Sequence, residues 1–145
     1  MALSNKDMYL SEYVSIINSA FDSNKPAKLD IKGSSMLPTL VEGDFVLLVP
    51  PTNLRKGDIV LYPTSSNTFA LHRIVKLGTT LQVIGDNNVT REYINPSTVI
   101  AKVQYICTSS NKYSVFSCKY RLKYLFVTIR RFFRRVINKL KQWLN

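Results

Sequence analysis

Hydrophobic and polar residues alternate with two different periods along the chain. Over residues 7–21 the apolar positions recur at the three- and four-residue spacing of an amphipathic helix. They are Met8, Leu10, Tyr13, Val14, Ile17, Ala20 and Phe21. From residue 28 to residue 107 the pattern changes to short apolar runs separated by turn residues, which predicts strands. The runs cover residues 45–49, 58–62, 68–77, 81–85 and 98–107. Short strands at close spacing favour a mainly β protein with a small, strongly bent β fold over βαβ units.

The last segment, residues 120–144, has the clearest helical pattern. Its apolar residues step by threes and ones into a single stripe, and its Lys and Arg residues fall largely off that stripe. The stripe consists of Leu122, Leu125, Phe126, Ile129, Phe132, Phe133, Val136, Ile137, Leu140, Trp143 and Leu144. We therefore expect a long, basic amphipathic helix at the C-terminus.

The charge of the chain divides it in the same way. A length of 145 residues fits one domain with a modest core. Residues 112–145 contain ten Lys or Arg and no acid, whereas residues 1–111 contain ten bases and nine acids, a net charge of +1. The basicity thus belongs to a C-terminal appendage. We expect an N-terminal helix and linker (1–27), a β domain (28–110) and the basic helix (111–145).

Several classes of protein do not fit this sequence. No stretch approaches the roughly 18 consecutive apolar residues of a membrane span, and the N-terminus lacks the apolar core of a signal peptide. We expect a protein at the membrane periphery or in the cytoplasm. Cys107, Cys118 and the single histidine do not form a metal-ligand pattern, so no metal or other cofactor is expected. Two reduced thiols are favoured over a disulfide between the two cysteines.

One short segment, KGSSMLPTL at residues 32–40, places Ser34 and Ser35 in a turn. A serine becomes a useful nucleophile only beside a base that takes its proton. The only histidine, His72, lies in a β-like run, where a structural role is common. Sequence distance does not bring the two together, so catalytic and structural interpretations both stay open on these residues alone.

The segment GSSMLPTL resembles the nucleophile box of type I signal peptidases, Gly-x-Ser-Met-x-Pro-Thr-Leu. The segments GDFVLL, KGDIVLY, HRIV and GDNN follow it in the order of that family. The resemblance covers roughly residues 30–107 and belongs to the S24/S26 superfamily, which also includes LexA-like self-cleaving repressors. It implies a small, bent β-barrel.

The resemblance also assigns residues. It implies Ser35 as the nucleophile and His72 as the general base, because a His rather than a Lys precedes RIV, as in the endoplasmic-reticulum-type members. Asp86 of GDNN is then expected to hold the imidazole in place. The endoplasmic-reticulum-type pattern often has a further Asp six residues later, and Glu92 at this position is a possible supporting acid. The expected substrate-binding residues are Met36, Leu37 and Pro38, with packing as an alternative for the first two.

The implied function is a serine endopeptidase that cuts signal or leader peptides with small residues before the cut. We expect no N-terminal transmembrane anchor, which would be a departure from the family. We expect residues 120–144 to bind an anionic membrane surface or a partner protein instead, with packing of the stripe on the β domain as the alternative. An inactive or regulatory LexA-like relative stays open as another function. A basic nucleic-acid-binding module fits the charge but not the wide apolar stripe, so no specific nucleic acid is expected.

Overall fold

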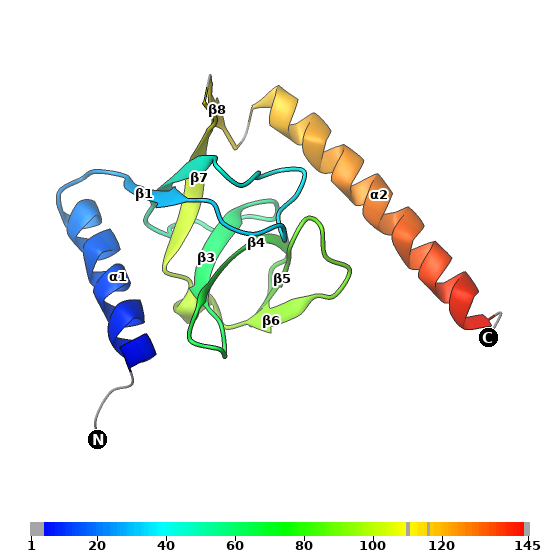
Figure 1. Ribbon diagram of the computed structural model, residues 1–145, viewed down its shortest axis with the longest axis horizontal. Coiled ribbons are helices and arrows are strands. Elements are labelled where there is room, and N and C mark those ends of the chain that lie inside the picture. Colours follow the sequence, from blue (N-terminus) through cyan, green and yellow to red (C-terminus); the bar gives the residue numbers. More distant parts are fainter. Residues whose placement is uncertain (1–4, 110, 116, 144–145) are drawn as a thin grey trace.

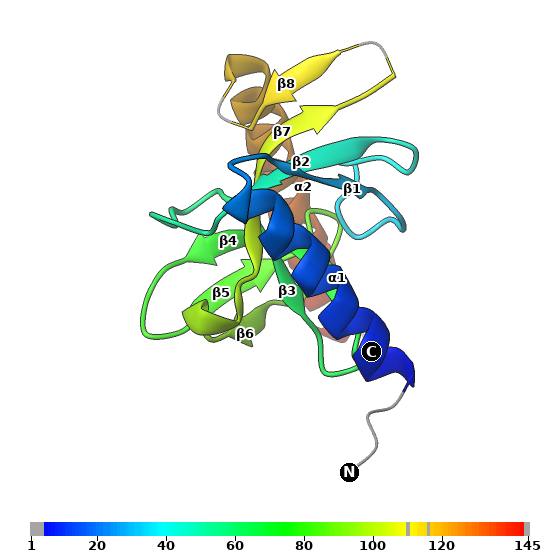
Figure 2. The same ribbon diagram turned by 90° about the vertical axis from the view of Figure 1, so that its left-hand side faces the viewer.

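A β body lies between two helices. The computed structural model describes the backbone of residues 5–109, 111–115 and 117–143, with the side chains of 10–109, 111–115, 117, 122 and 125–143. The elements in chain order are α1 (Asn5–Asp22), β1 (Ala27–Asp30), β2 (Phe45–Val49), β3 (Ile59–Pro63), β4 (Phe69–Lys76), β5 (Leu81–Ile84), β6 (Glu92–Ile94), the 3₁₀ turn η1 (Pro96–Thr98), β7 (Ala101–Cys107), β8 (Lys112–Ser114) and α2 (Cys118–Trp143). Helices α1 and α2 lie on opposite sides of the body (Figure 1; Figure 2).

The strands form one antiparallel sheet in the order β1-β2-β7-β3-β4-β5-β6, with β8 paired to β7. The sheet is curved but not closed, and β1 and β6 are its edges along this path. The register shifts between Leu47 and Leu48 and again between Ile74 and Lys76. Irregularities of this kind increase the local bend and twist of a sheet. The prediction of a mainly β fold with a helix at each end is confirmed.

The five predicted apolar runs correspond to β2, β3, β4, β5 and β7. The run at residues 98–107 begins too early, because η1 occupies Pro96–Thr98 and β7 starts at Ala101. The short strands β1, β6 and β8 were not among the predicted runs. Each has three or four residues and contains polar side chains, so its hydrophobic pattern is too short to stand out.

The core lies on both faces of β3, whose first four residues are all buried. Ile59 and Leu61 belong to one apolar cluster, and Val60 and Tyr62 belong to another on the opposite face. Helix α1 covers the first cluster through Ile17 and its neighbours on the same helical face. The predicted amphipathic character of this helix thus accounts for its position on the sheet.

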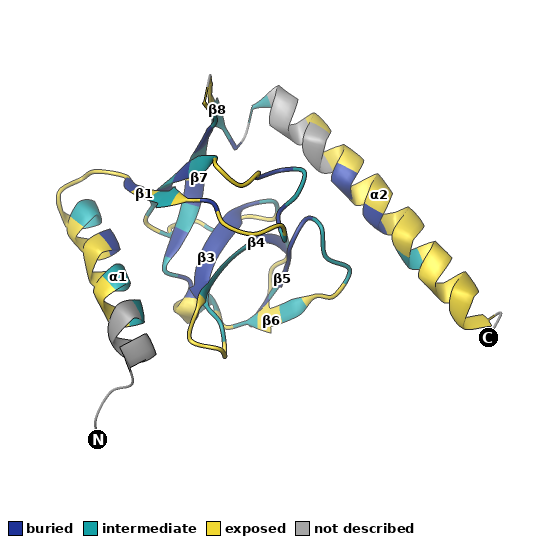
Figure 3. Ribbon diagram, viewed as in Figure 1, coloured by how far each residue is buried: buried dark blue, intermediate teal, exposed yellow. Residues whose placement is uncertain are grey.

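Helix α2 is different, because most of its described side chains are exposed (Figure 3). Val127 and Arg131 are its two buried residues among those described. Among the described helices, α2 included, none is long and apolar enough to cross a membrane. The thiol of Cys107 is free and buried in the body.

Candidate active site

The segment after β1 forms a tight turn that presents Ser35. Gly33 has a φ of +81°, a conformation that a residue with a side chain rarely adopts. The turn continues with hydrogen bonds from Leu37 N to Ser34 O (3.1 Å) and from Thr39 N to Met36 O (2.8 Å). Ser34 is exposed, whereas Ser35 is half-buried. The two adjacent serines therefore differ in environment.

A second loop, residues 85–88, fastens this turn to the sheet. Asn87 donates its backbone N–H to the carbonyl oxygen of Ser35 (2.8 Å) and its side-chain amide to that of Ser34 (3.3 Å). Gly85 also lies against the turn, because a Cβ at this position would be 2.7 Å from the Ser35 carbonyl oxygen. Glycine is thus required here for close approach of two backbones rather than for an unusual φ.

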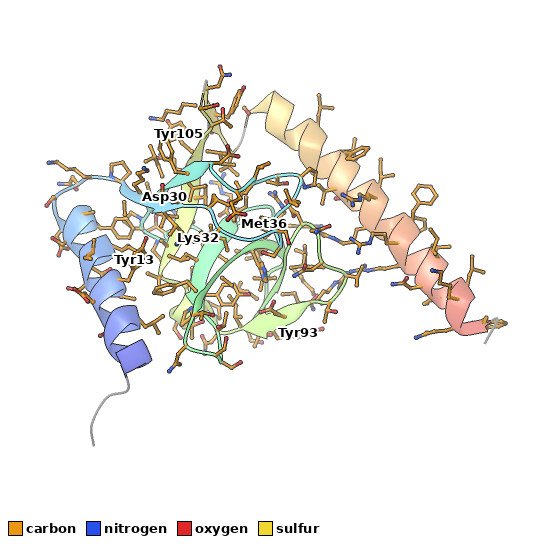
Figure 4. The ribbon with its side chains drawn as sticks, in the orientation of Figure 1. Tyr13, Asp30, Lys32, Met36, Tyr93 and Tyr105 are labelled. Carbon is orange, nitrogen blue, oxygen red and sulfur yellow. The ribbon has the colours of Figure 1, made fainter. Side chains whose placement is uncertain are left out.

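Ser35 lines a cavity of about 420 Å³ between α1, the turn and β4. Figure 4 labels four of the lining residues, with Tyr13 from α1 and Asp30, Lys32 and Met36 from the segment that leads through the turn. Tyr13 stacks at an angle on Phe69, with their ring centroids 5.5 Å apart. The remaining lining residues are Leu29, Ile31, Gly33, Leu40, Leu61, Ala70 and Leu71.

The cavity distinguishes the three residues predicted to bind substrate. Met36 is buried and lines the cavity, so it both packs in the core and faces the space next to Ser35. Leu37 and Pro38 are half-buried and are not part of the lining. The contribution of Tyr13 was missed, because its place in the helical pattern identified it only as a core residue.

The imidazole of His72, on β4, is held by two side chains. Its Nδ1 lies 3.0 Å from Oε1 of Glu92 on β6 and 2.7 Å from the hydroxyl oxygen of Tyr62 on β3. Tyr62 donates its hydroxyl proton to Oε2 of Glu92 (2.7 Å). Burial raises the pKa of Tyr62, and its bond to the Glu92 carboxylate raises it further, so the phenol keeps this proton.

This network fixes the tautomer of His72. The single hydroxyl proton of Tyr62 is directed to Glu92, so Nδ1 must carry the proton shared with Glu92 and the tyrosine oxygen. The neutral imidazole then has an unprotonated Nε2, which is the form that a general base requires. Burial lowers the pKa of His72 below its ordinary value, while the carboxylates of Glu92 and Asp86 oppose this effect. The neutral form is therefore the resting form at neutral pH.

Asp86 lies in a different set of contacts. Its buried carboxylate accepts two hydrogen bonds from Arg73, from Nε (2.9 Å) and Nη2 (2.6 Å), and one from the Thr39 hydroxyl (2.5 Å). Arg73 also donates to the carbonyl oxygen of Gly57 (2.9 Å). This cluster joins the end of the serine turn to β4 and to the 85–88 loop.

The structure thus gives the two acids different positions from those the resemblance implied. The resemblance assigned Asp86 to His72 and gave Glu92 a supporting role, but the side chain hydrogen-bonded to Nδ1 is that of Glu92. The reason is that adjacent residues of a strand point to opposite faces. Arg73 follows His72 on β4, so its guanidinium binds the Asp86 carboxylate on the other face of the strand. Tyr62 had no signal in the sequence, since it appears there as one apolar residue of a strand.

Ser35 lines the cavity, whereas His72 is not one of its lining residues. Ala70, on the same face of β4 as His72, lines the cavity together with Ser35. Among the described residues, no hydrogen bond joins the Ser35 hydroxyl to the imidazole. Bonds between nucleophile and base are often long without substrate and shorten in the complex. The Ser35 N–H has no acceptor in the described part of the chain.

Comparison with protein families identifies this part of the molecule. The family model described as Peptidase S24-like matches residues 2–105, more than two thirds of the chain. The match includes α1, the serine turn, His72 and the 85–88 loop, and ends before α2. A comparison with curated proteins found no match. The extent of the family match shows that the chain belongs to the Peptidase S24-like family.

Proposed function

We propose that the protein is a serine endopeptidase of the signal-peptidase type, with Ser35 as nucleophile, His72 as general base and Glu92 as the acid that orients His72. Membership of the S24-like family supports a function of the serine-peptidase or LexA-like type. The observation that carries the proposal is the contact of His72 Nδ1 with Glu92 and Tyr62, because it leaves Nε2 unprotonated. Asp86 then acts at a distance, by holding Arg73 and the serine turn.

The proposed reaction is acyl transfer in two steps. His72 Nε2 takes the hydroxyl proton of Ser35 while the serine oxygen attacks the scissile carbonyl carbon, and the resulting oxyanion accepts a hydrogen bond from the Ser35 N–H. The protonated imidazole gives its proton to the leaving amine, the C–N bond breaks, and an ester to Ser35 forms. Water then attacks the ester with His72 again as the base, and the protonated imidazole returns this proton to the Ser35 oxygen as the ester C–O bond breaks and the acid product leaves.

The cavity favours an extended peptide as substrate. Strand β5 pairs with β4 only from Arg73 onward, so along the preceding residues this side of β4 has no partner strand in the described chain. The segment after the edge strand β1 lines the opposite wall. An extended peptide between two open backbone edges gains main-chain hydrogen bonds and places alternate side chains in the cavity. We propose signal or leader peptides with small residues before the cut, presented at a membrane surface.

The test is cleavage of small-residue leader peptides by the purified chain beside detergent micelles. Ser35→Ala and His72→Ala are each expected to lose at least about a thousandfold in kcat/KM. Ser34→Ala is the matched control, since it removes the neighbouring, exposed hydroxyl and is expected to cut like the parent.

The outcomes separate catalysis from binding. Cleavage by Ser35→Ala or His72→Ala at the parental rate contradicts the assignment of these residues. If the parent binds the peptides and does not cut them, and a serine-reactive probe does not label Ser35, the regulatory LexA-like alternative replaces the peptidase. Labelling of the parent and of Ser34→Ala, but not of His72→Ala, supports the proposed pair.

A further inference from the structure

We infer that α2 docks on an anionic membrane surface through its outward face, with the β body held on the opposite side of the helix. This inference deepens the membrane part of the proposed function, but its test needs no peptidase activity, so either can fail alone. It rests on which residues of α2 face the body and which do not.

Among the described side chains of α2, those that face the body form a narrow and largely polar strip. Val127 is 1 % exposed and Arg131 is 8 % exposed. Arg131 donates from Nη2 to the carbonyl oxygen of Gly85 and to Oδ1 of Asp86, both at 3.3 Å. One turn further on, Arg134 donates from Nη1 to the carbonyl oxygen of Asn87 (2.8 Å). Residues 127, 131 and 134 are spaced to share one helical face, so this face is fixed toward the 85–88 loop.

The apolar stripe of α2 points away from the body. Ile129 lies two residues after Val127 and two before Arg131, which corresponds to about 200° of rotation around the helix. Val136 has the same relation to Arg134. All members of the stripe with described side chains are substantially exposed, including Phe132 at 64 % and Trp143 at 91 %. They are Leu122, Leu125, Phe126, Ile129, Phe132, Phe133, Val136, Ile137, Leu140 and Trp143. The alternative in which this stripe covers the β body does not fit these exposures.

Charge selects the occupant of this outward face. In the helix, Arg130 and Lys141 border the stripe on one side, and Arg135 and Lys139 border it on the other. Residues 112–145 contain no Asp or Glu. An apolar face with aromatic residues, edged on both sides by cations, fits the boundary between acyl chains and anionic headgroups, where long basic side chains reach the phosphates. A second copy of the chain would bring the same positive edges together and is therefore disfavoured.

The geometry also sets where the body lies. With its outward face in the headgroup layer, α2 separates the membrane from the 85–88 loop by about one helix diameter, about 10 Å. The serine turn is hydrogen-bonded to that loop through Asn87. The docked helix therefore holds the serine turn close to the membrane surface without inserting the body.

The single tryptophan provides the test, because Trp143 lies in the outward face. The full chain is titrated with vesicles of phosphatidylglycerol and phosphatidylcholine in equal parts, and with phosphatidylcholine alone. We expect a blue shift of Trp143 emission and protection from acrylamide with the anionic vesicles. Apparent affinity is expected to be at least tenfold weaker for the neutral vesicles and for anionic vesicles in 0.5 M salt.

Two variants with matched controls localise the contact. Phe132→Ser with Phe133→Ser is expected to weaken binding at least tenfold, whereas Ile16→Ser, which removes an equally exposed apolar side chain from α1, is expected to leave it unchanged. Both stripe substitutions are on exposed positions, so the urea midpoint of the body should not move. The flanking cations are tested in the same way by vesicle binding. The double variant Lys139→Gln, Lys141→Gln is expected to weaken binding, and the control double variant Lys25→Gln, Lys56→Gln is expected to leave it unchanged.

The inference is overturned if anionic vesicles cause no blue shift, or if the stripe variant binds them like the parent. It is equally overturned if the blue shift occurs without lipid and grows with protein concentration, since the face would then be covered by a second copy. Binding of neutral and anionic vesicles with equal affinity would contradict the role of the flanking cations.

Discussion

Asp86→Asn is the substitution that best separates the two acids near the site. The carboxylate of Asp86 is fully buried, and its main partner, Arg73, is 2 % exposed. An amide in its place would remove the charge and would turn an N–H₂ group toward the donors of Arg73 or Thr39. Arg73 and the buried Arg131, which also contacts Asp86 (3.3 Å), would then lose the carboxylate that pairs with them.

The expected cost follows from this burial. Removing one partner of a buried, hydrogen-bonded ion pair costs about 3–5 kcal/mol of unfolding free energy. With a urea m-value of about 2 kcal/mol/M, the unfolding midpoint falls by about 2 M. Asp58→Asn is the matched control, because Asp58 is also buried but its carboxylate accepts from the backbone N–H of Arg55 (2.9 Å), which an amide oxygen can replace. We expect a loss of about 1 kcal/mol or less for the control.

The assay is urea unfolding followed by far-ultraviolet circular dichroism, for both single variants and for a cycle with Arg73→Met. The double variant Arg73→Met with Asp86→Asn should lose less than the sum of the single losses by about 2 kcal/mol or more, because the Arg73–Asp86 pair is removed as a whole and only the more distant Arg131 (3.3 Å) stays without its carboxylate. The reasoning is refuted if Asp86→Asn costs no more than Asp58→Asn, or if the losses in the cycle are additive.

Three further predictions concern the catalytic groups. Glu92→Gln removes the largest electrostatic effect that opposes burial at His72, so the His72 pKa should fall further and the acid limb of kcat/KM should move to lower pH. The ring signals of the only histidine report this pKa directly by NMR, and a rise in the pKa contradicts the prediction. In the parent, burial lowers the folded-state pKa of His72, so the unfolded chain takes up the proton first as the pH falls. The stability measured by urea titration should therefore decrease as the pH falls below about 6.5. His72→Gln should flatten this part of the pH profile. Gly85→Ala must lengthen a 2.7 Å contact between its Cβ and the Ser35 carbonyl oxygen to about 3.4 Å, a displacement of about 0.7 Å. This should slow labelling of Ser35 by a serine-reactive probe on the order of tenfold. Unchanged labelling would show that the turn moves without any loss of Ser35 reactivity.

Much of the fold could be predicted because its main strands have strong local patterns. β3 is a continuous apolar run because it is buried on both faces, and β2 and β7 also fall in apolar runs. Edge strands such as β1 were not recognised, since they are short and their pairing depends on a neighbouring strand rather than on their own residues.

The candidate site could be predicted only as far as residue types and order allow. The motifs assign Ser35, His72 and two acids to one site. They do not predict which side of β4 each acid contacts. His72 and Arg73 are adjacent and point to opposite faces, so one residue of register decides that Glu92 meets the imidazole and Asp86 the guanidinium. The role of Tyr62 depends on the pairing of β3 with β4, which no local pattern contains.

The two arginines that hold α2 on the body change the effective charge of this helix. Two of the basic residues with described side chains in α2, Arg131 and Arg134, donate to the 85–87 segment, which leaves four of the six for an external anion. The six are Arg130, Arg131, Arg134, Arg135, Lys139 and Lys141. Counterions released on binding are set by the charges that reach the polyanion, not by the formal total. The described part of α2 should therefore contribute about four charges to the salt dependence of binding, fewer than its six basic residues.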